Sequence, residues 1–284
     1  MIIISSDSTA DLNFLFEERN IKTIPLAVIL NGQMHQDGID VNPQKIYDSV
    51  EETGSLPKTS ARSVEEYKEY FSSIKGEGDE IIHFSISSEI SVTCRNAIQA
   101  AEEIGGVHIV DGRSLSTGTG LLVLYACDLR DEGKLSVSEI AQKCRERAEF
   151  VEASFFVDKM DYLYKGGRCS GLASFVATAL GIKPSLLLKD GKIVVGKKYM
   201  GGVEKIAKQY VNNIFKMYSN PDLKRIFITY TYGTSEKVIN IIREEINKYF
   251  QFETVYQTVA SSTITCHCGK GTIGILFIND GKEN

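Results

Sequence analysis

Three segments rich in serine and threonine are the first candidates for chemistry, at residues 5–9, 59–63 and 85–93. Each lies where a predicted strand ends, and ligands of open parallel sheets bind beyond the carboxyl ends of the strands. An ionised carboxylate offers about four acceptor sites, which two hydroxyls and a cation or backbone N–H groups would satisfy. The segments therefore predict an anion site, with helix capping as the alternative for each segment alone.

His267 and Arg168 could complete such a site. Of the four histidines, only His267 lies in a stretch of glycine and cysteine, which we expect to be a turn before the last predicted strand. A histidine there can donate to an anion or act as a general base. Arg168 follows Gly166 and Gly167, and its guanidinium could reach a carboxylate or phosphate. A surface role for Arg168 fits the sequence equally well.

The cysteines favour free thiols over disulfides or a metal site. Six cysteines are scattered through 284 residues, and the pair in Cys266-His267-Cys268 has no second pair elsewhere. Structural zinc usually takes ligands two to four residues apart together with such a second pair. We therefore expect no metal, and a zinc or redox module on Cys266 and Cys268 is the alternative.

The sequence contains no convincing nucleotide-binding motif. Gly269, Gly271 and Gly274 have the spacing of a dinucleotide fingerprint, but a predicted strand follows them and the fingerprint requires a helix there. We expect these glycines to form a tight turn. The sequence GxxxxGK[ST] does not occur, so the chain has no recognisable ATP phosphate cradle. Kinase activity of this chain alone is therefore not expected, and no cofactor is predicted.

The composition of the chain argues against some classes of binding partner. The 32 basic and 37 acidic residues give a net charge of −5 without a run of either sign, which argues against binding to nucleic acid. The start of the chain lacks the basic and apolar regions of a signal peptide, and no window approaches 18 uninterrupted apolar residues. We expect a soluble cytoplasmic protein without stable membrane insertion.

Alternating apolar and amphipathic stretches predict an α/β fold, with a mostly parallel sheet in its N-terminal part. We expect two α/β domains, 1–150 and 151–284, with a ligand buried between them. Helix starts are predicted at Ser63 and Ser136, each followed by glutamate three residues later. Residues 172–183 predict an apolar helix rich in small residues, which either packs in the core or walls a ligand pocket.

Five motifs taken together resemble those of the DegV family of bacterial fatty-acid-binding proteins. The motifs occur in the family's order along nearly the whole chain: DSTADL at 7–12, KTSARS at 58–63, SSEISVT at 87–93, DYLYKGGR at 161–168 and HCGKGTIG at 267–274. The resemblance implies two α/β domains with a long-chain fatty acid buried between them. It also implies that the chain is a non-catalytic acyl-carrying subunit, which presents the acid to a separate ATP-binding fatty acid kinase.

The resemblance implies a residue set for the carboxylate. Thr59 and Ser91 match the hydroxyl donors nearest the head group, with His267 and Arg168 as outer polar and cationic partners. Ser60 and Thr93, which lie beside them, are weaker candidates. Such convergence is needed because an ionised carboxylate at the end of an apolar tunnel is costly without donors.

Three positions depart from the family pattern, which commonly has proline at Arg62, glycine at Val92 and proline at Lys270. Val92 adds bulk beside Ser91 and disfavours a positive φ, so a local change in the loop is expected. Arg62 and Lys270 add charge near the expected mouth, where they could help to dock a kinase. The competing function is a lipid hydrolase or acyltransferase using Ser91 and His267, although no GxSxG elbow supports it.

Overall fold

The computed structural model describes residues 1–169 and 181–281, and it confirms the α/β fold class. Four parallel strands form the N-terminal sheet in the order β2-β1-β6-β7: β1 (Ile2–Asp7), β2 (Lys22–Ile24), β6 (Glu80–Ser85) and β7 (Val107–Asp111). Parallel strands covered on both faces have continuous apolar runs. The start of β1 fits this rule, because Ile3 and Ile4 pack into clusters on opposite faces.

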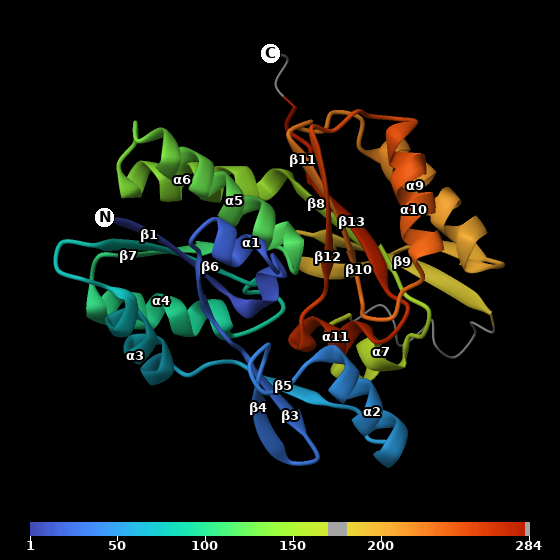
Figure 1. The fold of residues 1–284 in the computed structure, drawn as a ribbon, viewed down its shortest axis with the longest axis horizontal. Helices are drawn as coiled ribbons and strands as arrows, with labels where there is room; N and C mark the ends of the chain where they lie inside the picture. Colours follow the sequence, from blue (N-terminus) through green and yellow to red (C-terminus); the bar gives the residue numbers. More distant parts are fainter. Residues whose placement is uncertain (170–180, 282–284) are drawn as a thin grey trace.

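Helices cover both faces of this sheet (Figure 1). One layer holds α3 (Val64–Ile74) and α4 (Thr93–Ile104), and the other holds α5 (Thr117–Glu132) and α6 (Val137–Arg147). The predicted helix starts at Ser63 and Ser136 are confirmed, since each serine forms a reciprocal capping box with the glutamate three residues later. The short helices η1 (Ser8–Ala10), α1 (Leu15–Glu18) and η2 (Ala148–Phe150) complete this half.

A small antiparallel sheet, not expected from the sequence, lies beside the first one. Its order is β4-β3-β5, from β3 (Ala27–Leu30), β4 (Gln33–Gln36) and β5 (Lys58–Ser60), and α2 (Pro43–Thr53) packs on it. Thr59 and Ser60 therefore lie within a strand, where the sequence predicted a loop. The apolar run 22–30 is split between two sheets at Pro25, which has no N–H for a ladder.

The C-terminal sheet has six strands in the order β10-β9-β8-β13-β11-β12, antiparallel except for β11 with β12. The strands are β8 (Val151–Phe156), β9 (Ile182–Lys189), β10 (Lys192–Met200), β11 (Arg225–Tyr230), β12 (Thr254–Val259) and β13 (Ile273–Ile278). Helices α9 (Val203–Met217) and α10 (Glu236–Asn247) cover one face. A hairpin joins β9 to β10 at Asp190-Gly191, a pair typical of such turns, with positive φ of 50° and 78° at the two residues.

The other face of the C-terminal sheet packs against the N-terminal half. One continuous core joins Leu122 of α5 to Leu186 of β9 and Leu276 of β13. The domain boundary at 150 stays a prediction, and β8 begins directly after it. Most of the helix predicted at 172–183 lies outside the described residues. The prediction is wrong for residues 182 and 183, which pair with Met200 and Tyr199 in the β9–β10 ladder.

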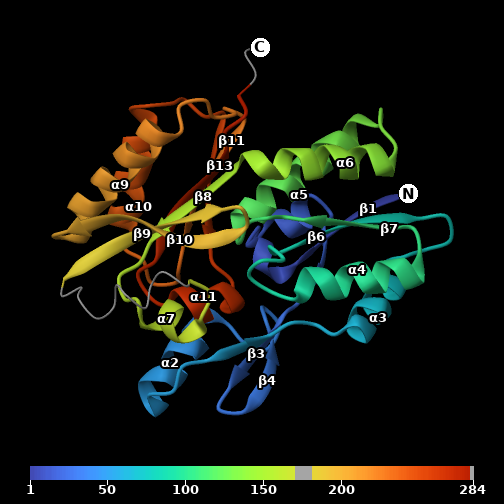
Figure 2. The ribbon, with the colours of Figure 1, turned by 180° about the vertical axis from the view of Figure 1, so that it is seen from behind.

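Two short helices, α7 (Asp161–Gly166) and α11 (Ser262–Cys268), lie side by side between the C-terminal sheet and the region of α2 and the small sheet (Figures 1 and 2). The expectation that His267 lies in a turn is wrong, because it belongs to the last turn of α11. The glycines at 269 and 271 do form the turn that follows, with φ of 68° and 80°, and they lead into β13.

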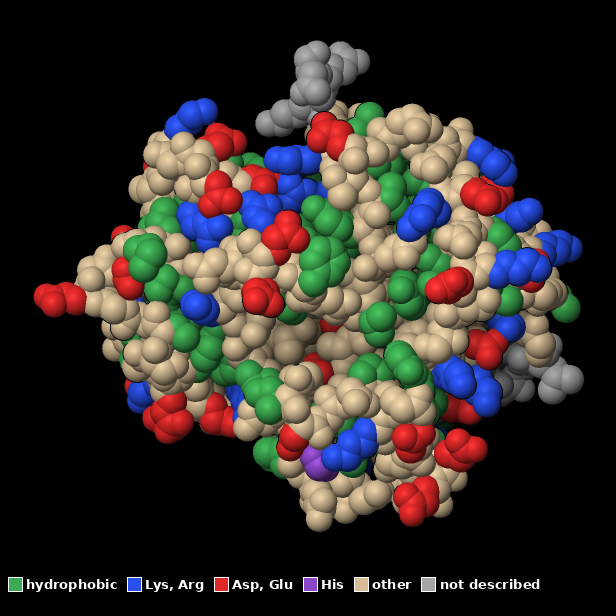
Figure 3. Space-filling view, viewed as in Figure 1, with side chains coloured by type: hydrophobic (Ala, Val, Ile, Leu, Met, Phe, Trp, Pro, Cys, Tyr) green, Lys and Arg blue, Asp and Glu red, His purple; other side chains and the backbone are tan. Residues whose placement is uncertain are grey.

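The surface carries both signs of charge. On the face in Figure 3, lysine and arginine side chains are interspersed with aspartate and glutamate, without a broad field of one sign. Within residues 1–169 and 181–281, every helix is too short or too polar to cross a bilayer.

Candidate functional site

A cavity of about 290 Å³ lies where β5, α11, the end of α7 and the segment 86–93 meet. It brings together all six residues that the sequence selected: Thr59, Ser60, Ser91, Thr93, Arg168 and His267. The remaining wall is largely apolar and includes Leu26, Ile86, Leu115, Leu163, Ile193 and Ile264. The volume is near the lower end of the range of about 300–1,000 Å³ that is typical of ligand pockets.

Thr59 and His267 form the hydrogen bond at the polar end of the cavity. The hydroxyl of Thr59 on β5 lies 2.8 Å from Nε2 of His267 on α11, although 208 residues separate them. Burial, with a further contribution from the positive charge of Arg168, lowers the pKa of His267 to about 4. The imidazole is therefore neutral at pH 7. If Nε2 carries the proton, it donates to Thr59 and leaves the threonine O–H free for a ligand.

Glycine is required next to this ring. A Cβ at Gly166, the last residue of α7, would lie 2.6 Å from Nδ1 of His267. The following Gly167 ends the helix with a left-handed φ of 68°. The Gly166-Gly167 pair therefore lets the chain pass close to His267 and then turn towards Arg168.

Arg168 borders the cavity but is otherwise exposed to solvent. Its Nη1 donates to the carbonyl oxygen of Gly166 at 2.6 Å, which holds the side chain over the end of α7. Four further N–H groups of the guanidinium remain for other acceptors. An anion at the polar end would thus meet a cation at the rim of the cavity, where its charge is partly compensated.

Ser91 lies on the segment that joins β6 to α4, and Thr93 is the first residue of α4. The Ser91 hydroxyl donates to Thr93 Oγ1 at 2.9 Å and accepts from the Thr93 N–H at 3.2 Å, so part of its capacity caps the helix. Val92 between them has φ of −74°, which a valine adopts freely, and its side chain is 54% exposed. The valine thus fits this loop through a right-handed helical backbone.

Ser60 is less available than Thr59. Its hydroxyl donates to the carbonyl oxygen of Ala61 at 3.3 Å. Arg62, two residues on, points its guanidinium away from any ligand role, since it donates to the Pro25 carbonyl and to Glu66, both at 2.6 Å.

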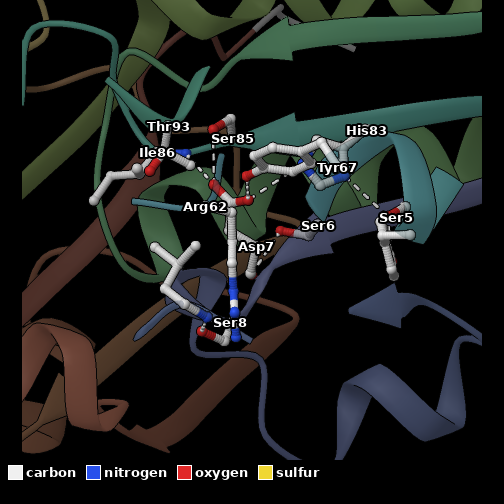
Figure 4. A network of polar contacts seen from close by, with 12 residues as sticks. Ser5, Ser6, Asp7, Ser8, Arg62, Tyr67, His83, Ser85, Ile86 and Thr93 are labelled. Carbon is white, nitrogen blue, oxygen red and sulfur yellow. Dashed lines mark hydrogen bonds and ion pairs between the residues drawn. The ribbon is translucent and has the colours of Figure 1, made fainter. Parts of the chain in front are cut away.

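A buried network centred on Asp7 positions the segment that carries Ser91 (Figure 4). One carboxylate oxygen of Asp7 accepts from the Ser85 hydroxyl at 2.7 Å and from the Ile86 N–H at 3.1 Å. The other oxygen accepts from the Tyr67 hydroxyl at 2.5 Å and lies 3.2 Å from Nε2 of His83. Residues 85 and 86, where the chain leaves β6 for the cavity, are therefore fixed by the end of β1.

Two further carboxylates hold the start of α11. Asp37 accepts from the N–H groups of Ser262 at 2.8 Å and Thr263 at 3.3 Å, and Ser8 donates to the same carboxylate at 2.9 Å. Asp11 accepts from the Ser261 N–H at 2.9 Å. Negative charge is favourable at the N-terminus of a helix. Burial nevertheless raises the pKa of Asp11 to about 7, against the hydrogen bonds from Ser116 and Ser261 that lower it.

The sequence analysis missed these carboxylates as positioning groups. The segment that begins the motif at 7–12 was selected for its hydroxyl groups as possible ligand donors. In the structure, Asp7, Asp11 and Ser8 of this motif make the contacts that orient the cavity walls. Asp37 lies in a loop after β4 without any local pattern to mark it. Only the tertiary contact with α11 reveals its role.

The cysteines next to His267 do not converge on a metal. Cys266 packs in the cluster of Val28 and Ile46, whereas Cys268 faces the cavity and the main core. Burial raises the pKa of Cys266 well above its usual range and that of Cys268 to about 12, so both stay as thiols. Cys94, Cys127, Cys144, Cys266 and Cys268 are free thiols. The described part of the chain contains no cluster of three or more His, Cys, Asp or Glu side chains with metal-binding geometry.

A second, smaller cavity of about 30 Å³ continues the first towards the C-terminal sheet. The two share Leu115, Ile264 and Cys268 as wall residues, and the smaller one reaches Phe155 and Leu276. Its volume holds little more than a water molecule. The two cavities are separated by these shared residues, and together they mark the direction of an apolar path from Thr59 and His267 towards the C-terminal sheet.

Fold and site together define an α/β protein with a largely apolar cavity, on whose wall Thr59 and His267 form a hydrogen-bonded polar pair. The chain belongs to the DegV family, described as uncharacterised, whose sequence pattern matches residues 1–280. A DegV domain-containing protein of Clostridium acetobutylicum is 29% identical over 98% of each chain.

Solved structures extend the similarity to the whole fold. A fatty-acid-binding DegV family protein from Thermus thermophilus is 29% identical, with a TM-score of 0.88 over 98% of this chain and 99% of that one. DegV from Bacillus subtilis, described as a fatty acid binding protein, is 26% identical, with a TM-score of 0.84 over 98% of this chain and 99% of that one.

Proposed function

We propose that this chain binds one long-chain fatty acid, with the carboxylate at the polar end of the cavity and the acyl chain along its apolar path. The observation that carries the proposal is that Thr59, Ser91, His267 and Arg168 line one cavity whose remaining wall is largely apolar. Ser60 contributes less, because its hydroxyl already donates its one proton to the Ala61 carbonyl. Ser91 and Thr93 act as a pair, in which Ser91 donates to Thr93 Oγ1 and the Thr93 proton remains for the carboxylate.

The acyl chain and the carboxylate of the ligand contribute differently to binding. Each buried methylene contributes about 0.8 kcal/mol, so a chain of ~16 carbons gains on the order of 12 kcal/mol before the costs of association. The carboxylate contributes less to affinity, because its hydration must be replaced by donors in the cavity. The tail therefore supplies affinity, and the head-group donors fix the orientation.

The solved relatives support this ligand class. The proteins from Thermus thermophilus and Bacillus subtilis, described as binding fatty acids, share the fold over nearly the full chain at 29% and 26% identity. In this structure the main cavity holds only part of such a ligand. Separation of the walls around Ile264 would join the main cavity to the smaller one.

The direct test is extraction of the purified protein with organic solvent, followed by mass spectrometry of the extract. We expect about one saturated or monounsaturated fatty acid per chain. A delipidated sample should then rebind such an acid with a rise in Tm, as expected for a ligand that binds only the folded state. Protein that carries no acyl chain and gains no stability with added fatty acid would contradict the proposal.

We further infer that the bound acid is presented to a separate ATP-binding kinase, which phosphorylates its carboxylate. The chain itself offers no phosphate cradle. Lys270 is the better docking cation of the two that depart from the family pattern, because its side chain is exposed whereas Arg62 is committed to Pro25 and Glu66. Lys270→Glu should weaken kinase-dependent acyl phosphate formation and reduce its salt dependence, while fatty acid binding is unchanged.

Geometry disfavours the alternative of a hydrolase built on Ser91 and His267. Nε2 of His267 bonds to Thr59, and the Ser91 hydroxyl bonds to Thr93. A catalytic base also needs a group to orient its second nitrogen, and Nδ1 of His267 has no partner among the described residues. Its pKa of about 4 makes the imidazole a weak base at pH 7. Ester hydrolysis that is lost in Ser91→Ala would restore this alternative.

A further inference from the structure

We propose that Thr263 is an additional ligand-binding residue, whose hydroxyl donates a hydrogen bond to the carboxylate of the bound fatty acid. The inference rests on the proposed function and adds a donor to the head-group set that the sequence did not select. Thr263 lies in the first turn of α11 and lines the main cavity.

The Thr263 hydroxyl is buried without a partner. The residue is only 5% exposed, and its Oγ1 has no hydrogen-bond partner within residues 1–169 and 181–281. Its backbone N–H is already bonded to Asp37, so the side chain is not needed to cap the helix. An unpaired buried hydroxyl is costly, and at a cavity wall the cost is removed when a polar ligand atom binds there.

The position of Thr263 on α11 indicates which part of the ligand its hydroxyl would contact. Thr263 precedes His267 by four residues, and side chains with this spacing lie on the same helix face, about 5–6 Å apart. Helical side chains also lean towards the N-terminus, so the imidazole of His267 leans back over the turn that carries Thr263. The two side chains therefore border the same end of the cavity, where the carboxylate is proposed to lie.

The opposite possibility is that the apolar tail covers Thr263. In that case binding would strip water from the hydroxyl without replacing its hydrogen bond. Removal of the hydroxyl would then strengthen binding, whereas removal of a donor to the carboxylate would weaken it. The sign of the change in affinity thus decides between the two positions of the ligand.

The test compares Thr263→Val with wild type, using delipidated protein and two probes, a saturated 16-carbon fatty acid and the alcohol of the same length. Valine keeps the branched shape of threonine and removes only the hydroxyl. Because the bond is to a charged group, we expect affinity for the acid to fall about tenfold to a hundredfold. Affinity for the uncharged alcohol should fall by about threefold at most.

Two further variants control for shape and position. Thr263→Ser retains a hydroxyl and should bind the acid within about threefold of wild type. Thr265, two residues on, is fully buried in the same helix but does not line the cavity, so Thr265→Val should leave affinity for the acid unchanged.

Unchanged or tighter binding of the acid by Thr263→Val would overturn the inference while leaving the proposed function intact. Equal losses for acid and alcohol would overturn it as well, because a general packing defect affects both ligands. Failure of the wild-type protein to bind the acid would overturn the proposed function and this inference together.

Discussion

The buried polar groups of the Asp7 network and those on the cavity wall differ in how completely they are hydrogen-bonded. In the network, the Asp7 carboxylate is surrounded by Tyr67, His83, Ser85 and the Ile86 N–H, so each of its oxygens has two neighbours at hydrogen-bond distance. On the wall, α11 leaves Thr263 Oγ1 and His267 Nδ1 without partners among the described residues. Both regions are buried, but only the first is satisfied by the protein itself.

This difference distinguishes residues that stabilise the fold around the cavity from residues that are proposed to contact the ligand. A satisfied network specifies one arrangement of its members and stabilises it. An unsatisfied polar group is a cost, which a binding protein recovers when the ligand arrives. Loss of a side chain from the Asp7 network should therefore reduce stability, whereas loss of a side chain from the cavity wall should chiefly reduce affinity.

The largest effect is expected for Asp7→Ala. It leaves the Ile86 N–H, the Ser85 and Tyr67 hydroxyls and His83 without their shared acceptor. Loss of one member of a buried charged network costs about 3–5 kcal/mol. Urea denaturation should show this decrease in the free energy of unfolding.

Asp48→Ala is the matched control, because the Asp48 carboxylate is exposed and, among the described residues, accepts only from Gln44 one turn earlier. Its effect should lie within about 0.5 kcal/mol of zero. Similar stability for the Asp7 and Asp48 variants would mean that the Asp7 network contributes nothing beyond a surface carboxylate.

Local patterns predicted much of the fold. Capping boxes at Ser63 and Ser136, the Asp190-Gly191 turn and the alternation of apolar runs all report on interactions within a few residues. The helix α11 escaped prediction for the opposite reason. Its Thr263, Ile264 and Thr265 are β-branched and disfavour a helix, which the Asp37 and Asp11 contacts at its N-terminus stabilise instead.

The candidate site was predictable only in part. Resemblance selected Thr59, Ser91, Arg168 and His267, and the fold brings them to one cavity. Thr263 was not selected, since one threonine among many hydroxyls carries no local signal. Its burial without a partner becomes visible only after α11 is placed against the cavity.

An intermediate effect is expected from His267 as pH falls. Its pKa is about 4 in the folded protein, and about 6.5 is usual for an unfolded chain. Between these values the unfolded state binds the proton and the folded state does not, so stability decreases as pH falls from about 6.5 to about 4. The contribution is at most about 3 kcal/mol.

His267→Gln should remove this contribution, and the difference between variant and wild type isolates it from other titrating groups. Asp11 acts in the opposite direction, because its raised pKa of about 7 makes folding more favourable as pH falls through that value. Asp11→Asn should therefore steepen the loss of stability towards acid pH. Parallel pH profiles for wild type and His267→Gln would contradict the assigned cause.

The smallest effects on stability, and a clear effect on binding, are expected at the head-group hydroxyls. Thr59→Val removes a proposed donor to the carboxylate, and Ser91→Ala removes the hydroxyl that donates to Thr93 Oγ1 and orients the Thr93 hydroxyl. Each should weaken binding of a 16-carbon fatty acid about tenfold or more. Both side chains border the cavity, where water can replace them in the free protein, so the free energy of unfolding should change by less than about 1 kcal/mol. Titration calorimetry and urea denaturation measure the two quantities on the same samples.

Ser60→Ala provides the internal comparison for Thr59→Val. Ser60 neighbours Thr59 on β5 and lines the same cavity, but its hydroxyl already donates to the Ala61 carbonyl. We expect a change in affinity of less than about threefold, because the hydroxyl has no second proton to give to a carboxylate. A loss at Ser60 as large as that at Thr59 would mean that the donor exchanges partners when the ligand binds, and that hydrogen bonds in the free protein do not rank the head-group residues.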